Sequence, residues 1–126
     1  YWAEGENRDN GQPLNAVGPA EAVLGAYWQS PDARSEIRLL LTASERWSRR
    51  DDSGGELFEP PGYGVVDLFV AHTFGNKLTV RAGIGNVTER LYWRWSSVHG
   101  LAPDDVLLPT LAESGRNYSI GLQWDW

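Results

Sequence analysis

Histidine is the side chain best suited to ligate a metal in this sequence, and there are only two, His72 and His99. A neutral imidazole nitrogen is a common metal ligand. His72 falls on the apolar side of a segment that alternates apolar and polar residues, which favours a position at an interface. His99 falls in a long polar segment, where an ordinary surface role competes with a ligand role. The sequence therefore leaves His99 as its one candidate for contact with a bound group.

Carboxylates gather in two places along the chain. One polar segment holds an acidic cluster and another holds an acidic pair: Asp51, Asp52, Glu56 and Glu59, then Asp104 and Asp105. Calcium prefers such oxygens, but the spacing matches no defined calcium loop. Paired carboxylates also serve glycoside hydrolysis, and nothing in the sequence constrains their separation. We expect solvated surface at both places, and no metal site.

Two further motifs have a chemical and a structural interpretation. Trp93 and Trp95 could stack on a sugar or a porphyrin, but an aromatic girdle with loop packing is the favoured interpretation. Gly83 and Gly85 lack the following helix that a dinucleotide site needs, so we interpret them as small residues that leave space beside one face of a sheet. No Ser/His/Asp arrangement is apparent, and we predict no catalytic residue and no enzyme activity.

The composition excludes several classes of protein. The chain has 126 residues, no Cys, no Met and a net charge of −6. It therefore has no disulfide framework, and it lacks the basic stripe of a nucleic-acid binder. No run approaches the ~20 apolar residues of a membrane helix. Residues 1–5 lack the basic and apolar regions of a signal peptide, and they look like mid-strand, which predicts a fragment of a longer chain.

Alternation with a period of two residues dominates the sequence. It is clearest at the end, where Tyr118, Ile120, Leu122, Trp124 and Trp126 alternate with polar residues or Gly. Successive side chains of a strand point to opposite faces, so one face of this strand is apolar and the other polar. The same pattern predicts strands over 21–29, 35–48, 63–74, 77–93 and 116–126, and residues 1–8 look like the end of a truncated strand.

The connections between these segments alternate in length. Residues 30–34 and 75–76 are short turns, whereas 9–20, 49–62 and 94–115 are long and polar. An antiparallel meander with short periplasmic turns and long extracellular loops is typical of outer-membrane barrels. The apolar face would then meet lipid and the polar face the lumen, with every backbone group paired between strands.

This orientation predicts two aromatic belts. We expect one belt near the periplasmic boundary and the other near the extracellular boundary, because aromatic rings settle at the level of the lipid headgroups. The first belt would contain Trp28, Phe74, Trp124 and Trp126, and the second Trp47, Tyr92 and Trp93. His72 falls on the lipid-facing register near the first belt.

Several stretches resemble the C-terminal end of TonB-dependent outer-membrane receptors, specifically the haem and haemoglobin (haemoglobin, transferrin and lactoferrin) receptor type. They are residues 11–15 with 22–25, 51–52 through 57–63, 67–68, 86–95 and 115–118 leading to the terminal aromatic residue. The stretch before Tyr92 and the last strand are shared by the whole superfamily, whereas Tyr92-Trp93-Arg94-Trp95 and Leu101 resemble the haem group. The sequence departs from the family in Trp126, where Phe is common, and in Val87 and Glu89, which replace Leu and Asp.

The resemblance implies an all-β fold in which residues 1–126 form the last six strands, the first one truncated, of a 22-stranded barrel with a plugged lumen. It also implies location in the outer membrane, contact with lipid and with a plug domain from the same protein, and energy from the TonB complex through an N-terminal region outside this chain. No resident cofactor is expected. The cargo would be haem or haem from a carrier protein such as haemoglobin, with His99 as the candidate contact.

Two alternatives stay open at this stage. The same barrel could carry a ferric siderophore or another cargo. From a different class, a soluble all-β carbohydrate-binding module could use its Trp residues as sugar platforms. Dependence on detergent would separate the two classes, because a soluble module stays monomeric without it.

Overall fold

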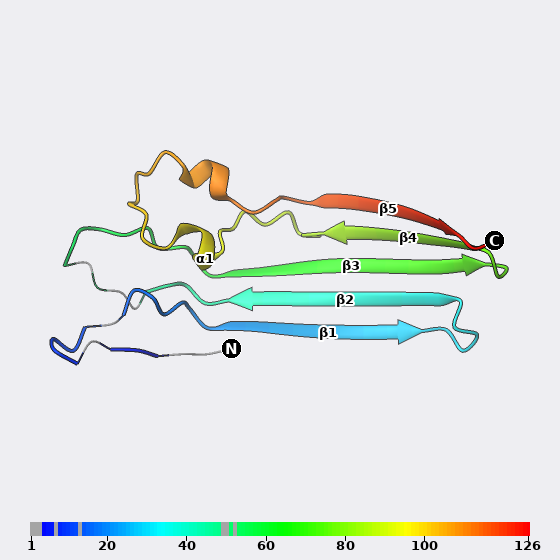
Figure 1. Cartoon of the computed structure of the whole chain (residues 1–126), viewed down its shortest axis with the longest axis horizontal. Helices are drawn as coiled ribbons and strands as arrows, with labels where there is room; N and C mark the ends of the chain where they lie inside the picture. The colour runs from blue at the N-terminus through cyan, green and yellow to red at the C-terminus, as the bar shows by residue number, and fades with distance from the viewer. Residues whose placement is uncertain (1–3, 7, 13, 49–50, 52) are drawn as a thin grey trace. The chain divides into compact units, whose positions relative to one another are not determined.

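The computed structural model describes residues 4–6, 8–12, 14–48, 51 and 53–126. Within them the chain forms one five-stranded sheet in which strands adjacent in sequence are adjacent in space, in the order β1-β2-β3-β4-β5 (Figure 1). The strands are β1 (Glu21–Gln29), β2 (Ser35–Ser44), β3 (Tyr63–Phe74), β4 (Leu78–Gly85) and β5 (Asn117–Trp124). Successive arrows in Figure 1 reverse direction, so the predicted all-β antiparallel meander is confirmed.

The chain divides into two compact units. The loop unit comprises residues 1–22, 43–63 and 91–113, and the sheet unit comprises 23–42, 64–90 and 114–126. The loop unit contains the short helix α1 (Trp95–Val98) and the 3-10 helix η1 (Leu108–Leu111). Over the described part of the chain, no helix has the length and apolar character to cross a membrane.

Both short connections are tight turns. Gly75 has a φ of 59°, a left-handed conformation that glycine adopts at little cost, and it starts the turn between β3 and β4. In the turn between β1 and β2, Asp32 accepts hydrogen bonds from the Ser30 hydroxyl (2.5 Å) and the Arg34 amide (3.2 Å). Such side-chain bonds to a turn backbone favour the turn over extended chain.

Strand register places the apolar side chains on one face of the sheet. His72, Val80 and Leu122 lie side by side on β3, β4 and β5, and Ala82 pairs with Ile120 in the next row. Ile120 is 79% exposed and Leu122 is 72% exposed in this chain. Apolar surface of this extent does not face water in a soluble monomer, so this face needs cover from outside the chain.

The structure corrects the boundaries of three predicted strands. β2 ends at Ser44 rather than at residue 48, and β5 ends at Trp124 rather than at 126. β4 ends at Gly85 rather than at residue 93, because Asn86 and Glu89 take left-handed φ values of 50° and 55° that extended chain cannot contain.

The truncated sixth strand predicted at residues 1–8 falls partly outside the described residues. Of the described residues in that range, Glu6 forms an isolated bridge and none belongs to a strand.

The core of the loop unit corrects the predicted extracellular belt. Trp47 is 2% exposed and Tyr92 is 8% exposed, so neither ring can stand in lipid headgroups. The Trp47 indole donates to the backbone carbonyl of Val17 at 3.0 Å, and Tyr92 packs on Tyr63 with ring centroids 4.5 Å apart. These rings hold loop segments together. In the sheet unit, by contrast, Trp28, Phe74 and Trp124 are each more than half exposed, as the periplasmic belt requires.

Candidate binding surfaces

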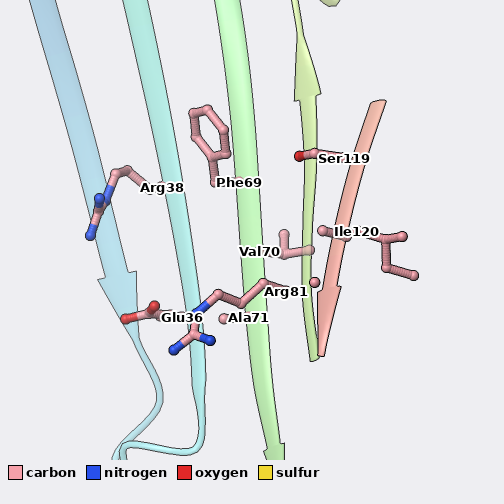
Figure 2. Close-up of a pocket in the computed structure, with 10 residues that line it drawn as sticks. Glu36, Arg38, Phe69, Val70, Ala71, Arg81, Ser119 and Ile120 are labelled. Carbon is pink, nitrogen blue, oxygen red and sulfur yellow. The ribbon is translucent and has the colours of Figure 1, made fainter. Parts of the chain in front are cut away.

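The polar face of the sheet unit carries a shallow hollow of about 490 Å³. The lining residues come from β2, β3, β4 and β5, and Figure 2 shows Glu36 and Arg38 on β2 and Arg81 on β4 among them. Side chains of both signs therefore line the same hollow. A surface of this kind suits a protein partner with its own polar groups better than a hydrocarbon phase.

Hydrogen bonds fix several of the polar side chains on this face. The Tyr27 hydroxyl donates to Glu36 Oε2 at 3.2 Å, and the Arg38 guanidinium lies 5.8 Å from the centre of the Tyr27 ring. Arg81 donates from Nη1 to Gln123 Oε1 at 2.9 Å. These cross-strand contacts order charged side chains that would otherwise sample many rotamers.

The space beside Gly83 and Gly85 is used by this chain itself. A Cβ on Gly83 would come within 2.6 Å of Ser119 Oγ and 2.8 Å of the Phe69 ring. A Cβ on Gly85 would lie 2.6 Å from Asn117 Oδ1. The glycines therefore make room for neighbouring strand side chains, which refines the prediction that they leave open space beside the sheet.

His99, the predicted contact residue, lies at the C-terminal end of α1 in the loop unit. Its ring stacks on Trp95 with centroids 4.7 Å apart and an interplanar angle of 26°. His99 Nδ1 lies 3.2 Å from the Ser96 carbonyl oxygen, which can only accept, so the neutral ring carries its proton on Nδ1. Nε2 then keeps a free lone pair on an exposed side chain. A backbone carbonyl that fixes the tautomer in this way is a common feature of histidine metal ligands.

Trp93 and Trp95 both pack inside the loop unit. Trp93 meets Phe58 edge-on at 5.6 Å and donates from Nε1 to the Leu108 carbonyl at 2.8 Å. Trp95 meets Trp47 at 6.0 Å, and its ring lies so close to Gly18 that a Cβ there would approach within 2.8 Å. Loop packing, the favoured interpretation, describes both rings better than an open stacking platform.

The acidic residues do not converge on a common point in the part of the chain that the structure describes. Asp51 accepts from the Ser53 amide at 2.9 Å, and hydrogen bonds from Ser53 lower the Asp51 pKa. Glu59 binds Arg46, and Asp105 accepts from the Leu107 amide at 2.9 Å. Asp52 lies outside the described residues. No group of three or more potential metal ligands occurs among the described side chains.

His72 lies on the apolar face of the sheet unit, as predicted. It is exposed, its Nδ1 shares a hydrogen bond of 2.7 Å with Ser35 Oγ on β2, and its ring meets Phe74 edge-on at 4.4 Å. His72 therefore belongs to the sheet unit, whereas His99 belongs to the loop unit.

Comparison with known protein families shows which family this sheet belongs to. The family model for "TonB dependent receptor-like, beta-barrel" matches residues 1–87. The chain belongs to the TonB-dependent receptor β-barrel family. The predicted family and its place in the outer membrane are confirmed, and the alternative of a soluble carbohydrate-binding module is set aside. The family consists of transport receptors rather than enzymes, in agreement with the absence of a predicted catalytic residue.

Two similar proteins have names that refer to the binding or utilization of haemoglobin or haemoglobin-haptoglobin. The chain is 26% identical over 114 residues to the hemoglobin and hemoglobin-haptoglobin-binding protein of Haemophilus ducreyi, covering 79% of this chain and 12% of that protein. It is 29% identical over 103 residues to the hemoglobin-haptoglobin utilization protein B of Neisseria meningitidis serogroup C, covering 73% of this chain and 13% of that protein. The chain therefore spans about an eighth of the length of these curated relatives.

A solved transporter has the same fold. The copper transporter OprC superposes with a TM-score of 0.72 at 19% identity, covering 99% of this chain and 20% of that chain. Because the sequence identity is so low, this similarity is evidence for the barrel fold and not for a shared cargo. In an outer-membrane barrel, apolar side chains face lipid and polar side chains face the interior. The apolar face of the sheet unit is therefore its lipid-facing side, and the polar face is its interior face.

One structural junction of the receptor barrel was missed by sequence reasoning. Asn86 is 2% exposed, and its amide donates from Nδ2 to the carbonyls of Arg90 (2.8 Å) and Ser114 (3.2 Å). Its Oδ1 accepts from the Arg90 amide at 2.8 Å, and its own backbone N–H donates to Asp67 Oδ1 at 2.8 Å. The Asn-x-Thr stretch that carries the family resemblance was the available signal. Its role is to end β4 and tie that end to the segment before β5.

Proposed function

We propose that the full-length protein is an outer-membrane receptor that takes up haem, or haem from haemoglobin, by TonB-dependent transport. The observation that carries the proposal is the match of this family member to relatives named for the binding or utilization of haemoglobin or haemoglobin-haptoglobin, at 24–29% identity. In this proposal residues 1–126 are the C-terminal portion of the barrel. Haem is the transported cargo and not a resident cofactor.

The two faces of the sheet unit would have separate roles in such a receptor. The apolar face would seal the barrel into the lipid, since Ile120 and Leu122 extend from it without cover in this chain. The interior face, with Glu36, Arg38 and Arg81, would meet the plug domain of the same protein. The TonB complex would act through an N-terminal region outside this chain.

The loop unit would contribute to the extracellular surface that receives the haem carrier. Its long loops are braced by the Trp47–Trp95 and Phe58–Trp93 ring pairs, so they present a defined surface. His99 is the candidate contact with haem, because its Nε2 lone pair is exposed and its tautomer is fixed by Ser96. A neutral imidazole in this state is the form that ligates haem iron.

Growth on defined iron sources tests the proposal. A strain that lacks the full-length receptor gene, and the same strain with the gene restored, would be grown with haemoglobin, free haemin, a ferric siderophore or copper as the limiting nutrient. We expect the restored gene to rescue growth on haemoglobin and haemin and to leave the other arms unchanged. Rescue of growth on the siderophore alone would contradict haem uptake and favour the ferric siderophore as the cargo.

A direct binding measurement separates recognition from transport. Purified full-length receptor in detergent would be mixed with immobilised haemoglobin, with immobilised serum albumin as the control protein. The proposal predicts retention on haemoglobin only. Equal retention on both proteins, or on neither, would contradict it.

A further inference from the structure

One polar pair interrupts the lipid-facing surface of the sheet unit. Ser35 on β2 and His72 on β3 lie on the same face as Val80 and Leu122, and they share a hydrogen bond of 2.7 Å. Polar groups facing hydrocarbon are costly unless they are paired. The bond satisfies one ring nitrogen of His72, and its Nε2 is left without a hydrogen-bond partner among the described residues.

An apolar groove of about 280 Å³ extends along the strands from this pair. Glu36 also lines the groove, but its walls are mainly aliphatic and aromatic: Trp28, Ile37, Val70, Phe74, Val80 and Ala82. Trp28, His72, Phe74 and Val80 lie close to the short turns, and Val70 and Ala82 lie further along the strands. The groove is therefore polar at the turn end and hydrocarbon-like beyond it, which is the polarity of a single lipid molecule.

The turn end carries two cations, Arg34 and Lys77, with Asp32 in the turn of Arg34 and Asp125 beside Lys77. Arg34 directly precedes Ser35 in the turn between β1 and β2, and Lys77 lies in the turn between β3 and β4. The Arg34 amide carbonyl accepts from the Thr73 N–H at 2.8 Å, so the first turn is held against β3, the strand that carries His72. Arg34 is only loosely paired with Asp32, at 3.9 Å with both side chains more than half exposed. Arg34, which adjoins Ser35 and keeps an exposed guanidinium, complements an anionic headgroup.

We propose that Ser35, His72 and the adjoining groove form a binding site for a glycerophospholipid of the leaflet that borders the short turns. The phosphodiester would accept a hydrogen bond from His72 Nε2, oriented by Ser35, and it would lie near Arg34. One acyl chain would extend from His72 along the groove past Val70 and Ala82. Phe74, edge-on to the His72 ring, restricts the imidazole to this orientation. The proposal depends on the outer-membrane family of the chain and is independent of the cargo of the receptor.

Native mass spectrometry of the full-length receptor tests this site. Detergent-purified receptor would be titrated with phosphatidylglycerol and, separately, with diacylglycerol of the same acyl chains, which lacks the phosphate. We expect phosphatidylglycerol to bind at least tenfold more tightly than diacylglycerol, because it adds a charge-assisted hydrogen bond. His72→Leu should reduce that preference about tenfold. Thr73→Val, on the opposite face of the same strand, is the matched control and should keep it.

Each result of the titration either supports the site or overturns it. Equal binding of the two lipids by the wild-type receptor would overturn the proposal, and so would an unchanged preference in His72→Leu. Displacement of phosphatidylglycerol by inorganic phosphate alone would also overturn it, since the acyl chain would then contribute nothing. His72→Asn, which keeps a polar side chain beside Ser35, guards against misfolding: it should bind diacylglycerol like wild type while losing the preference for phosphatidylglycerol. Haemoglobin binding by the same variants should be unchanged, which separates this test from that of the cargo.

Discussion

The Asn86 junction gives the most quantitative test of this structure. Replacing Asn86 by Gly removes three side-chain hydrogen bonds, those with the Arg90 carbonyl, the Arg90 amide and the Ser114 carbonyl. At about 0.5–1.5 kcal/mol each, with their partners left partly buried and unpaired, the loss is roughly 2–4 kcal/mol. Glycine adopts the φ of 50° without strain, so this variant isolates the hydrogen bonds.

Replacing Asn86 by Ala adds a second cost. Alanine loses the same three bonds, and it must also take a left-handed conformation that costs a residue with a Cβ about 1–2 kcal/mol. Asn86→Ala should therefore be destabilised by about 1 kcal/mol more than Asn86→Gly. The difference between the two variants measures the backbone strain at the end of β4.

Hydrogen exchange is the suitable assay, because the junction can open without unfolding the whole barrel. The full-length receptor in detergent would be exchanged in deuterated buffer, and the peptide containing residues 86–92 would be followed by mass spectrometry. A loss of 2–4 kcal/mol corresponds to exchange about thirtyfold to a thousandfold faster than in wild type. Exchange within about threefold of wild type in both variants would refute the role assigned to the Asn86 side chain.

Four further perturbations probe other parts of the chain. Gly83→Val should destabilise the barrel by about 1–3 kcal/mol in urea unfolding, because its Cβ would meet Ser119 and Phe69, and adding Phe69→Ala should recover part of the loss. Ile120→Arg, on the lipid face near the middle of β5, should cost roughly 2–4 kcal/mol in lipid vesicles, whereas Gln123→Arg on the interior face should cost far less. Hydrogen bonds from the Ser30 hydroxyl and the Arg34 amide lower the Asp32 pKa. The stability they confer is therefore present above the ordinary pKa of 3.8 and is lost as pH falls through the lowered value. The unfolding free energies of wild type and Asp32→Asn should converge in acid, and a difference between them that stays constant with pH would contradict the assignment. His99→Ala should weaken haemin binding by the full-length receptor about tenfold and shift its Soret absorption, while Ser97→Ala on the same helix should leave both unchanged.

The sequence by itself determined the strands and the faces of the sheet. Alternation from Tyr118 to Trp124 needs no tertiary partner, because successive residues of any strand point to opposite sides. The short turns at residues 30–34 and 75–76 were equally visible, since Gly75 and Asp32 act on the backbone within a few residues. His72 was correctly placed on the lipid-facing side for the same reason. Local chemistry decides these features, and the sequence records it.

Only the tertiary structure decided which aromatic rings face lipid and where strands end. Trp47 was predicted in a belt, but its indole finds the Val17 carbonyl, thirty residues away in sequence, and the ring is buried. β4 ends at Gly85 because the Asn86 amide reaches Ser114, a partner that no local pattern reveals. Contacts of this kind depend on which distant segments meet, and each outweighs the local preference for extended chain. Sequence periodicity reports the direction of a side chain, whereas the fold determines what that side chain meets.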